Sequence, residues 1–136
     1  MVKLTATFPD LSKLLLRLGA GASFIFHGSQ KLFGGYGGSG IERFVTFITT
    51  LGIPYPEISA WLAAGTEFFC GIALTIGFFA RLASIPLIFV MGVAIYSVTG
   101  KKGFNITDGG FEYNIVLIAI LLSIFLAGPG KYNVKD

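Results

Sequence analysis

Charged residues divide the chain into long apolar stretches. Uncharged runs cover residues 18–30, 68–80, 82–100 and 113–130. A helix needs roughly 17–25 mostly apolar residues to cross a hydrocarbon core of about 30 Å, and the last two runs meet that length unaided. The first meets it if Arg17 and Lys31 reach toward opposite head-group layers, and the second if Glu67 lies inside the membrane. The pattern predicts four spanning helices, over residues 14–33, 58–79, 82–99 and 112–127.

The linker between the first two predicted spans contains an element of its own. It opens with a glycine-rich run over residues 34–40, and apolar residues then recur at helical spacing over residues 41–51. Pro54 and Pro56 follow, and proline ends helices. The segment is too short to cross a bilayer, so we expect an amphipathic helix that lies in the interface or folds back as a lid.

Composition supports a membrane protein and excludes several other classes. Hydrophobic residues make up 54% of the 136 residues and charged residues 12%, and the mean hydropathy is +0.78. So few charged side chains cannot cover the surface of an ordinary soluble enzyme, and the net charge of +3 comes from scattered cations rather than a basic patch. We therefore expect an all-α membrane protein, a single four-helix domain over residues 1–136, with lipid as a partner and no nucleic acid.

Charges in the loops predict the orientation. The side that holds both termini carries six cations (Lys3, Lys13, Arg17, Arg81, Lys131 and Lys135), whereas the other side carries four. The positive-inside rule then places both termini in the cytoplasm, in a multi-pass protein of the cytoplasmic membrane. No small-residue cleavage site follows a short apolar core near the amino terminus, so the first span is predicted to be retained.

Glu67 is the first candidate for chemistry. It is the tenth residue of the predicted span over 58–79, which places it about 15 Å from the outer end at ~1.5 Å per residue. A carboxyl group at that depth is costly whether it is paired or protonated. It predicts a proton-carrying or ligand-binding group, with a structural hydrogen bond between helices as the alternative.

The first span carries the other candidates. His27 lies about 9 Å inside the outer end, which allows it to contact Glu67 if the first two spans are neighbours. Lys31 follows one turn later, and Arg17 precedes Lys31 by close to four turns, so the three share one stripe. The stripe either faces Glu67 in a common site, or its two cations anchor the span at opposite interfaces while His27 bonds a neighbouring helix.

Glu112 completes the set of candidates. It opens the fourth predicted span, where a carboxylate complements the helix dipole, or it pairs with Lys31 at the outer rim. One histidine and one cysteine cannot build a zinc or iron–sulfur site within one chain, so we expect no metal ligands and no covalently bound cofactor. Any redox chemistry would then use a bound organic molecule or a partner.

Five short motifs in order resemble the DoxX/DoxD-like family of small four-helix membrane proteins, over essentially the whole chain. They are Arg17-Leu18 with His27-Gly28-x-x-Lys31, Leu51-Gly52-Ile53-Pro54, Glu67-x-x-x-Gly71-x-x-Leu74-x-x-Gly77 followed by Arg81, Gly109-Gly110-x-Glu112, and Gly128-Pro129-Gly130. The resemblance implies a four-helix bundle with a quinone or similar lipophile between the helices. Some relatives look like the membrane subunit of a thiosulfate:quinone oxidoreductase, which passes electrons to quinone.

Three functions follow from the residues and the resemblance together. In the first, the chain is a quinone-associated subunit of an oxidoreductase with a thiosulfate- or thiol-linked donor. Glu67 and His27 would then be the proton groups, while Arg17, Lys31 and Glu112 would bind the quinone or the substrate. In the second, the chain binds or transports a small lipophile or anion without catalysis. In the third, it anchors a soluble redox partner. The protein partners that we consider are a second oxidoreductase subunit and a second copy of this chain, which would form a homodimer.

Overall fold

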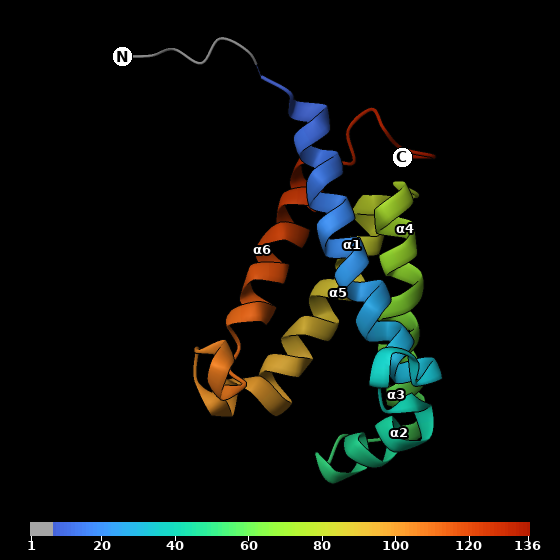
Figure 1. The fold of residues 1–136 in the computed structure, drawn as a ribbon, viewed down its shortest axis with the longest axis vertical. Coiled ribbons are helices and arrows are strands. Elements are labelled where there is room, and N and C mark those ends of the chain that lie inside the picture. Colours follow the sequence, from blue (N-terminus) through green and yellow to red (C-terminus); the bar gives the residue numbers. More distant parts are fainter. Residues whose placement is uncertain (1–6) are drawn as a thin grey trace.

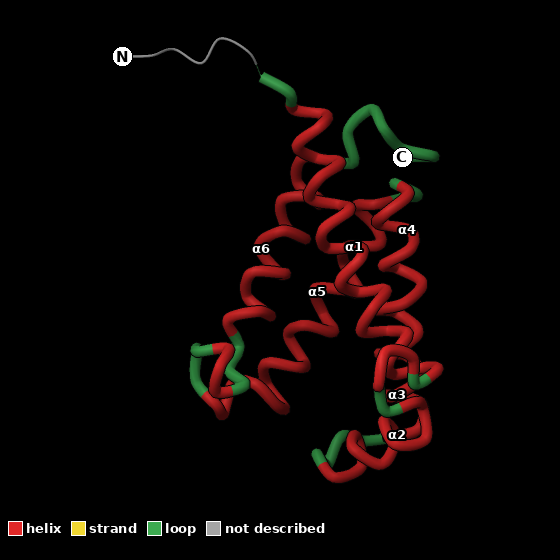
Figure 2. Tube along the Cα trace, viewed as in Figure 1, coloured by secondary structure: helices red, strands yellow, loops and turns green. Residues whose placement is uncertain are grey.

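The computed structural model describes residues 7–136, and this part of the chain is helical (Figures 1 and 2). Its α-helices are α1 (Pro9–Phe33), α2 (Gly40–Thr50), α3 (Pro56–Gly65), α4 (Gly71–Ile76), α5 (Ala80–Ala94) and α6 (Glu112–Ala127). A π-helical segment, Thr66–Cys70, joins α3 to α4, and a second one, Ile95–Thr99, extends α5. Short 3₁₀ turns occupy Gly35–Gly37, Gly100–Lys102 and Ile106–Asp108.

The ends of the helices follow from local sequence. Proline opens α1 and α3, at the position where a missing backbone N–H costs nothing. Gly34 ends α1 in the left-handed conformation, at φ 71°, and its N–H donates to Gln30 O. Gly77 ends α4 in the same conformation, and the chain reverses there into α5.

The helices form a bundle in which α1 lies beside α4 and α5 lies beside α6 (Figure 1). The start of α1 and the carboxyl terminus lie at one end, and α2 lies at the other end, next to α3. The core where α1, α4, α5 and α6 meet contains the buried residues Phe24, Leu74, Leu87 and Leu121. A second apolar cluster joins α2 to α3, and the buried faces of both helices supply it.

Glycine sets how closely α1 approaches the helix formed by α3, the π segment and α4. A Cβ atom added to Gly28 would lie 2.5 Å from the backbone nitrogen of Phe68. Small residues allow such close contact between helices. The approach brings the end of α1 against the π segment, which contains Glu67.

Two helical stretches, Pro56–Ile76 and Ala80–Lys102, are long and apolar enough to cross a membrane. The other two predicted spans correspond to α1 and to α6, which is apolar but has 16 residues. That all four cross a bilayer stays a prediction, as does the single domain over residues 1–136. Helix α2 covers most of the predicted amphipathic segment, residues 41–51. Lys3, which contributes to the predicted charge bias, lies outside the described residues.

Candidate functional site

An ion pair inside the bundle forms the centre of the candidate site. Lys31 Nζ lies 2.5 Å from Glu67 Oε1, where it donates a hydrogen bond. The Glu67 side chain is only 2% exposed and that of Lys31 is 28% exposed. Within residues 7–136 this is the one ion pair found. A buried carboxylate needs such a partner, because desolvation otherwise disfavours its charge.

The two residues are brought together by a local irregularity and by an aromatic ring. Glu67 lies in the π segment between α3 and α4, and such segments occur frequently at functional sites. Lys31 lies in the last turn of α1, and its ammonium group is 5.3 Å from the centre of the Phe44 ring. The electron-rich face of the ring attracts the ammonium group, and the contact links the end of α1 to α2.

A cleft of about 630 Å³ opens on one side of the ion pair. Helices α2, α3 and α5 supply its walls, which are mostly apolar, and Lys31 and Glu67 are its charged groups. Several wall residues, including Leu62 and Phe89, are strongly exposed. We refer to this space as the apolar cleft. Its size and character suit a small, largely hydrophobic ligand with one polar end.

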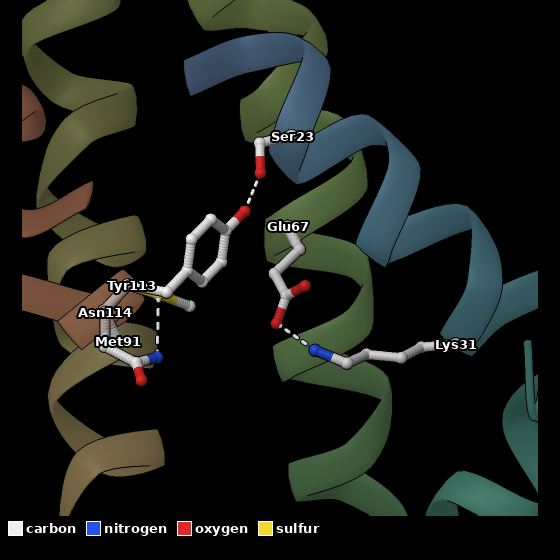
Figure 3. A network of polar contacts seen from close by, with 6 residues as sticks. All are labelled: Ser23, Lys31, Glu67, Met91, Tyr113 and Asn114. Carbon is white, nitrogen blue, oxygen red and sulfur yellow. Dashed lines mark hydrogen bonds and ion pairs between the residues drawn. The ribbon is translucent and has the colours of Figure 1, made fainter. Parts of the chain in front are cut away.

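A smaller cavity, of about 130 Å³, lies on another side of the same pair. His27, Lys31, Glu67, Tyr113 and Asn114 line it, together with apolar residues that include Phe24, Met91 and Leu117. We refer to it as the polar chamber. Figure 3 shows Tyr113 and Asn114, both from α6, on the opposite side of this space from Glu67 and Lys31. The ion pair therefore has one apolar and one polar neighbouring space.

Hydrogen bonds fix the chamber walls. The Tyr113 hydroxyl is hydrogen-bonded to Ser23 Oγ, which joins α6 to α1 (Figure 3). The buried Asn114 donates from Nδ2 to Met91 Sδ at 3.5 Å, which joins α6 to α5. A thioether sulfur is a weak acceptor. The amide of Asn114 is therefore held in position with hydrogen-bonding capacity to spare.

His27 lies beside Glu67 without bonding to it in the described part of the chain. Both residues line the polar chamber. The imidazole packs edge-on against Phe26, with ring centroids 5.3 Å apart, and against Tyr113, at 5.7 Å. The structure therefore brings together three of the predicted site residues, namely His27, Lys31 and Glu67.

Arg17 lies apart from them. Its guanidinium group donates to the main-chain carbonyl oxygens of Pro129 at 2.8 Å, Tyr132 at 2.6 Å and Thr75 at 3.3 Å. The side chain is 1% exposed. These bonds tie the carboxyl-terminal segment to α1 and α4, so in this structure Arg17 holds the tail rather than a ligand near Glu67.

Glu112 also lies apart from the ion pair. Its carboxylate accepts a hydrogen bond from the N–H of Ile106, at 3.3 Å, and so closes the loop that precedes α6. It lies in the first turn of that helix, where it complements the helix dipole. The pairing with Lys31 that the sequence left open is not formed, since Lys31 pairs with Glu67.

Tyr113, Asn114 and Ser23 are site residues that the sequence reasoning missed. All three are uncharged residues, whereas the residues predicted from the sequence are acidic or basic. A signal was present nonetheless, because Tyr113 and Asn114 follow Glu112 in the first turn of an otherwise strongly apolar helix. An amide in such a segment requires a polar partner or a polar cavity.

Among residues 7–136, no cluster of three His, Cys, Asp or Glu side chains could hold a metal ion.

Comparison with known proteins gives distant relatives. The chain is 28% identical over 127 residues to inner membrane protein YphA of Escherichia coli, covering 88% of this chain and 85% of the relative. It is 26% identical over 115 residues to a Bacillus subtilis protein named "Putative oxidoreductase CatD", covering 85% and 79%. An uncharacterized Haemophilus influenzae protein is 27% identical over 77 residues, which are 57% of this chain and 51% of that protein.

No solved structure gives a significant match. The family model for DoxX matches residues 12–100, more than half of the chain. That segment includes the ion pair, the apolar cleft and most of the polar chamber. The chain belongs to the DoxX family and is a membrane protein.

Proposed function

We propose that this protein is a multi-pass subunit of a quinone-linked oxidoreductase system, with a quinone head group held at the Lys31–Glu67 pair. The observation that carries the proposal is that this pair, with Glu67 buried and Lys31 partly exposed, supplies the charged groups of an otherwise apolar cleft. The Bacillus subtilis relative is named "Putative oxidoreductase CatD". That name favours redox chemistry over other uses of the cleft.

The cleft has the properties that a lipophilic ligand requires. Its volume of about 630 Å³ lies within the roughly 300–1,000 Å³ typical of small-molecule sites. Wall residues such as Leu62 and Phe89 are strongly exposed. If the bundle spans a membrane, these side chains would contact lipid. A ligand dissolved in the bilayer could therefore enter from the side and leave an isoprenoid tail between α3 and α5.

The two charged groups supply complementary roles. A bound quinone accepts two electrons and two protons. The Lys31 ammonium group would donate a hydrogen bond to a carbonyl oxygen and stabilise negative charge developing there. The Glu67 carboxyl would hold or release a proton beside that oxygen. Low dielectric surroundings strengthen both effects relative to water.

The membrane arrangement belongs to the same proposal. In it, α1, the Pro56–Ile76 and Ala80–Lys102 stretches and α6 cross the cytoplasmic membrane, with both termini in the cytoplasm. The 25 residues of α1 give a length of about 37 Å, enough to cross the ~30 Å core. Helix α2 would lie in the outer interface, with its buried face on α3. The electrons would come from a second oxidoreductase subunit with a thiosulfate- or thiol-linked donor.

The test is organic extraction and mass spectrometry of the purified full chain, compared with an unrelated membrane protein from the same cells. We expect close to one quinone per chain in the wild type and a loss of at least about tenfold in Glu67→Gln, the equivalent of ~1.4 kcal/mol of binding. Glu57→Gln is the matched control, because Glu57 is an exposed carboxylate in the first turn of α3. It should retain the quinone.

Folding is checked separately by size-exclusion chromatography in detergent. If Glu67→Gln does not fold, the doubly neutral Lys31→Gln/Glu67→Gln protein replaces it, because it leaves no unpaired charge. Quinone at the level of the unrelated protein would contradict the proposal. It would favour transport of another lipophile or anion if sealed vesicles take one up, and a membrane anchor if Glu67 affects only stability and the recovery of a partner.

A further inference from the structure

The Lys31–Glu67 pair separates two spaces of different chemistry. Both residues line the apolar cleft, and both also line the polar chamber. The cleft serves the proposed quinone site, but the chamber is not needed to hold that ligand. Its walls come instead from α1, the π segment, α5 and α6.

One oxygen of Glu67 has no protein donor in the described part of the chain. The bond to Lys31 uses Oε1, and no residue between 7 and 136 donates to Oε2. The side chain is only 2% exposed, but Oε2 is not fully buried, because the fully buried side-chain atom without a partner in the described residues is Arg17 Nε. In the view of Figure 3 the second oxygen lies on the α1 side of the carboxylate, away from Tyr113 and Asn114. A carboxylate oxygen that keeps accessible surface inside the bundle and has no protein donor can accept its hydrogen bond from water.

The other chamber groups are suited to bind water. The amide of Asn114 has only the Met91 sulfur as a partner in the described residues, and His27 offers a ring nitrogen without a hydrogen bond among them. Other than Glu67, the titratable groups on the chamber walls are His27 and Lys31 from α1 and Tyr113 from α6, while α5 contributes Met91 and Ala94. A water needs two to four polar partners to be held in a cavity, and these walls offer them.

The volume agrees with this chemistry. At the roughly 30 Å³ that a water occupies in the liquid, the chamber's 130 Å³ holds about four molecules. The chamber also lies near one end of the bundle. Tyr113 and Asn114 lie in the first turn of α6, and His27 and Lys31 lie near the end of α1, so the chamber is close to the end of the bundle that carries the 100–111 loop.

We infer that the polar chamber is a water-filled pocket that opens toward this end of the bundle and places water against Oε2 of Glu67. A proton from the outer aqueous phase then passes through chamber water to Oε2, and the reverse movement returns it. The quinone meets the opposite side of the same pair. The use of that proton for quinone rests on the proposed function, whereas the presence of water in the chamber does not.

Cysteine labelling tests the inference without any quinone. A thiol reacts with methanethiosulfonate ethylammonium as the thiolate, which requires contact with water. Asn114→Cys and Leu117→Cys place thiols on the chamber wall, although Asn114 is 7% and Leu117 4% exposed. Val116→Cys is the matched control on the same helix, because Val116 is 51% exposed on the outside of the bundle, where lipid would cover it.

The three variants are made in a Cys70→Ala background and reconstituted in lipid nanodiscs. Their reaction rates are read by counter-labelling of the unfolded chain. We expect both chamber cysteines to react at least about tenfold faster than Val116→Cys, the reverse of the order of exposure in the protein alone. Two chamber positions guard against one variant that fails to fold.

Chamber cysteines that react as slowly as Val116→Cys, or more slowly, would overturn the inference. That result would leave the quinone proposal intact, since mass spectrometry of the wild type tests it independently. Conversely, fast labelling in a protein that retains no quinone would support the water pocket and contradict the proposed function.

Discussion

The unequal burial of the two charges in the ion pair makes a prediction about stability. Lys31→Met leaves the Glu67 carboxyl, which is 2% exposed, without a partner. Removing one member of a buried pair costs about 3–5 kcal/mol, and we expect about 3 kcal/mol because the adjoining chamber lets water reach one oxygen.

Glu67→Gln leaves a lysine whose side chain is 28% exposed and that can still donate to the new amide oxygen. We expect this variant to cost about 1 kcal/mol. The double variant Lys31→Met/Glu67→Gln carries no unpaired charge, so its free energy of unfolding should lie within ~1 kcal/mol of the wild type. The costs of the two single variants then sum to about 3–5 kcal/mol more than the cost of the double variant, and this difference is the coupling between the two sites.

The assay is equilibrium unfolding in mixed detergent and SDS micelles, followed by the fluorescence of Trp61, the only tryptophan. Lys101→Met serves as the control, because Lys101 is an exposed lysine in the loop before α6. Equal costs for the two single variants, or costs that simply add in the double variant, would refute the reasoning from burial.

Two further predictions concern the frame around the site. Gly28→Ala should lower the free energy of unfolding by about 1–3 kcal/mol, because the new Cβ would lie 2.5 Å from the backbone of Phe68. The control Gly19→Ala, with nothing within 4 Å, should be neutral or slightly stabilising in the same assay. Arg17→Met removes three bonds to main-chain carbonyls. It should speed tryptic cleavage of the tail at Lys131 at least about tenfold while leaving quinone retention unchanged; a tail that stays protected, or a lost quinone, would contradict the role given to Arg17.

Sequence reasoning found the centre of the site because burying a carboxylate in an apolar helix is costly. Glu67 stood out on that ground, and His27 and Lys31 followed from their depth in the neighbouring span. The structure places all three around one chamber. The helical segments were predictable for a similar reason, since long runs without charge determine where helices can lie in a bilayer.

Arg17 shows the limit of helical periodicity. It shares a face with Lys31, but the two residues are 14 positions apart, which corresponds to about 21 Å along the axis. A shared face therefore does not give a shared site. The partners of Arg17 are carbonyl groups of the tail, and the tail's return to α1 and α4 is a tertiary contact that local spacing cannot show.

Neither the π segment nor the neutral chamber residues were predicted from the sequence, for different physical reasons. The π segment Thr66–Cys70 adds one residue to a turn, and nothing in those five residue types distinguishes it from an α-helix. Asn114 was detectable in principle, because an amide near the start of an apolar span requires a partner. Its partner, Met91 on α5, follows only from the packing of α5 against α6.

The central claim is that a quinone head group occupies the apolar cleft at Lys31–Glu67, and photolabelling with an azidoquinone in nanodiscs tests it most directly. Peptide mapping should place the label on the cleft walls, in α2, α3 and α5, and Glu67→Gln should reduce this labelling at least about tenfold, whereas Glu57→Gln should not. Labelling spread over the outer faces of the helices, and unchanged in Glu67→Gln, would contradict the account.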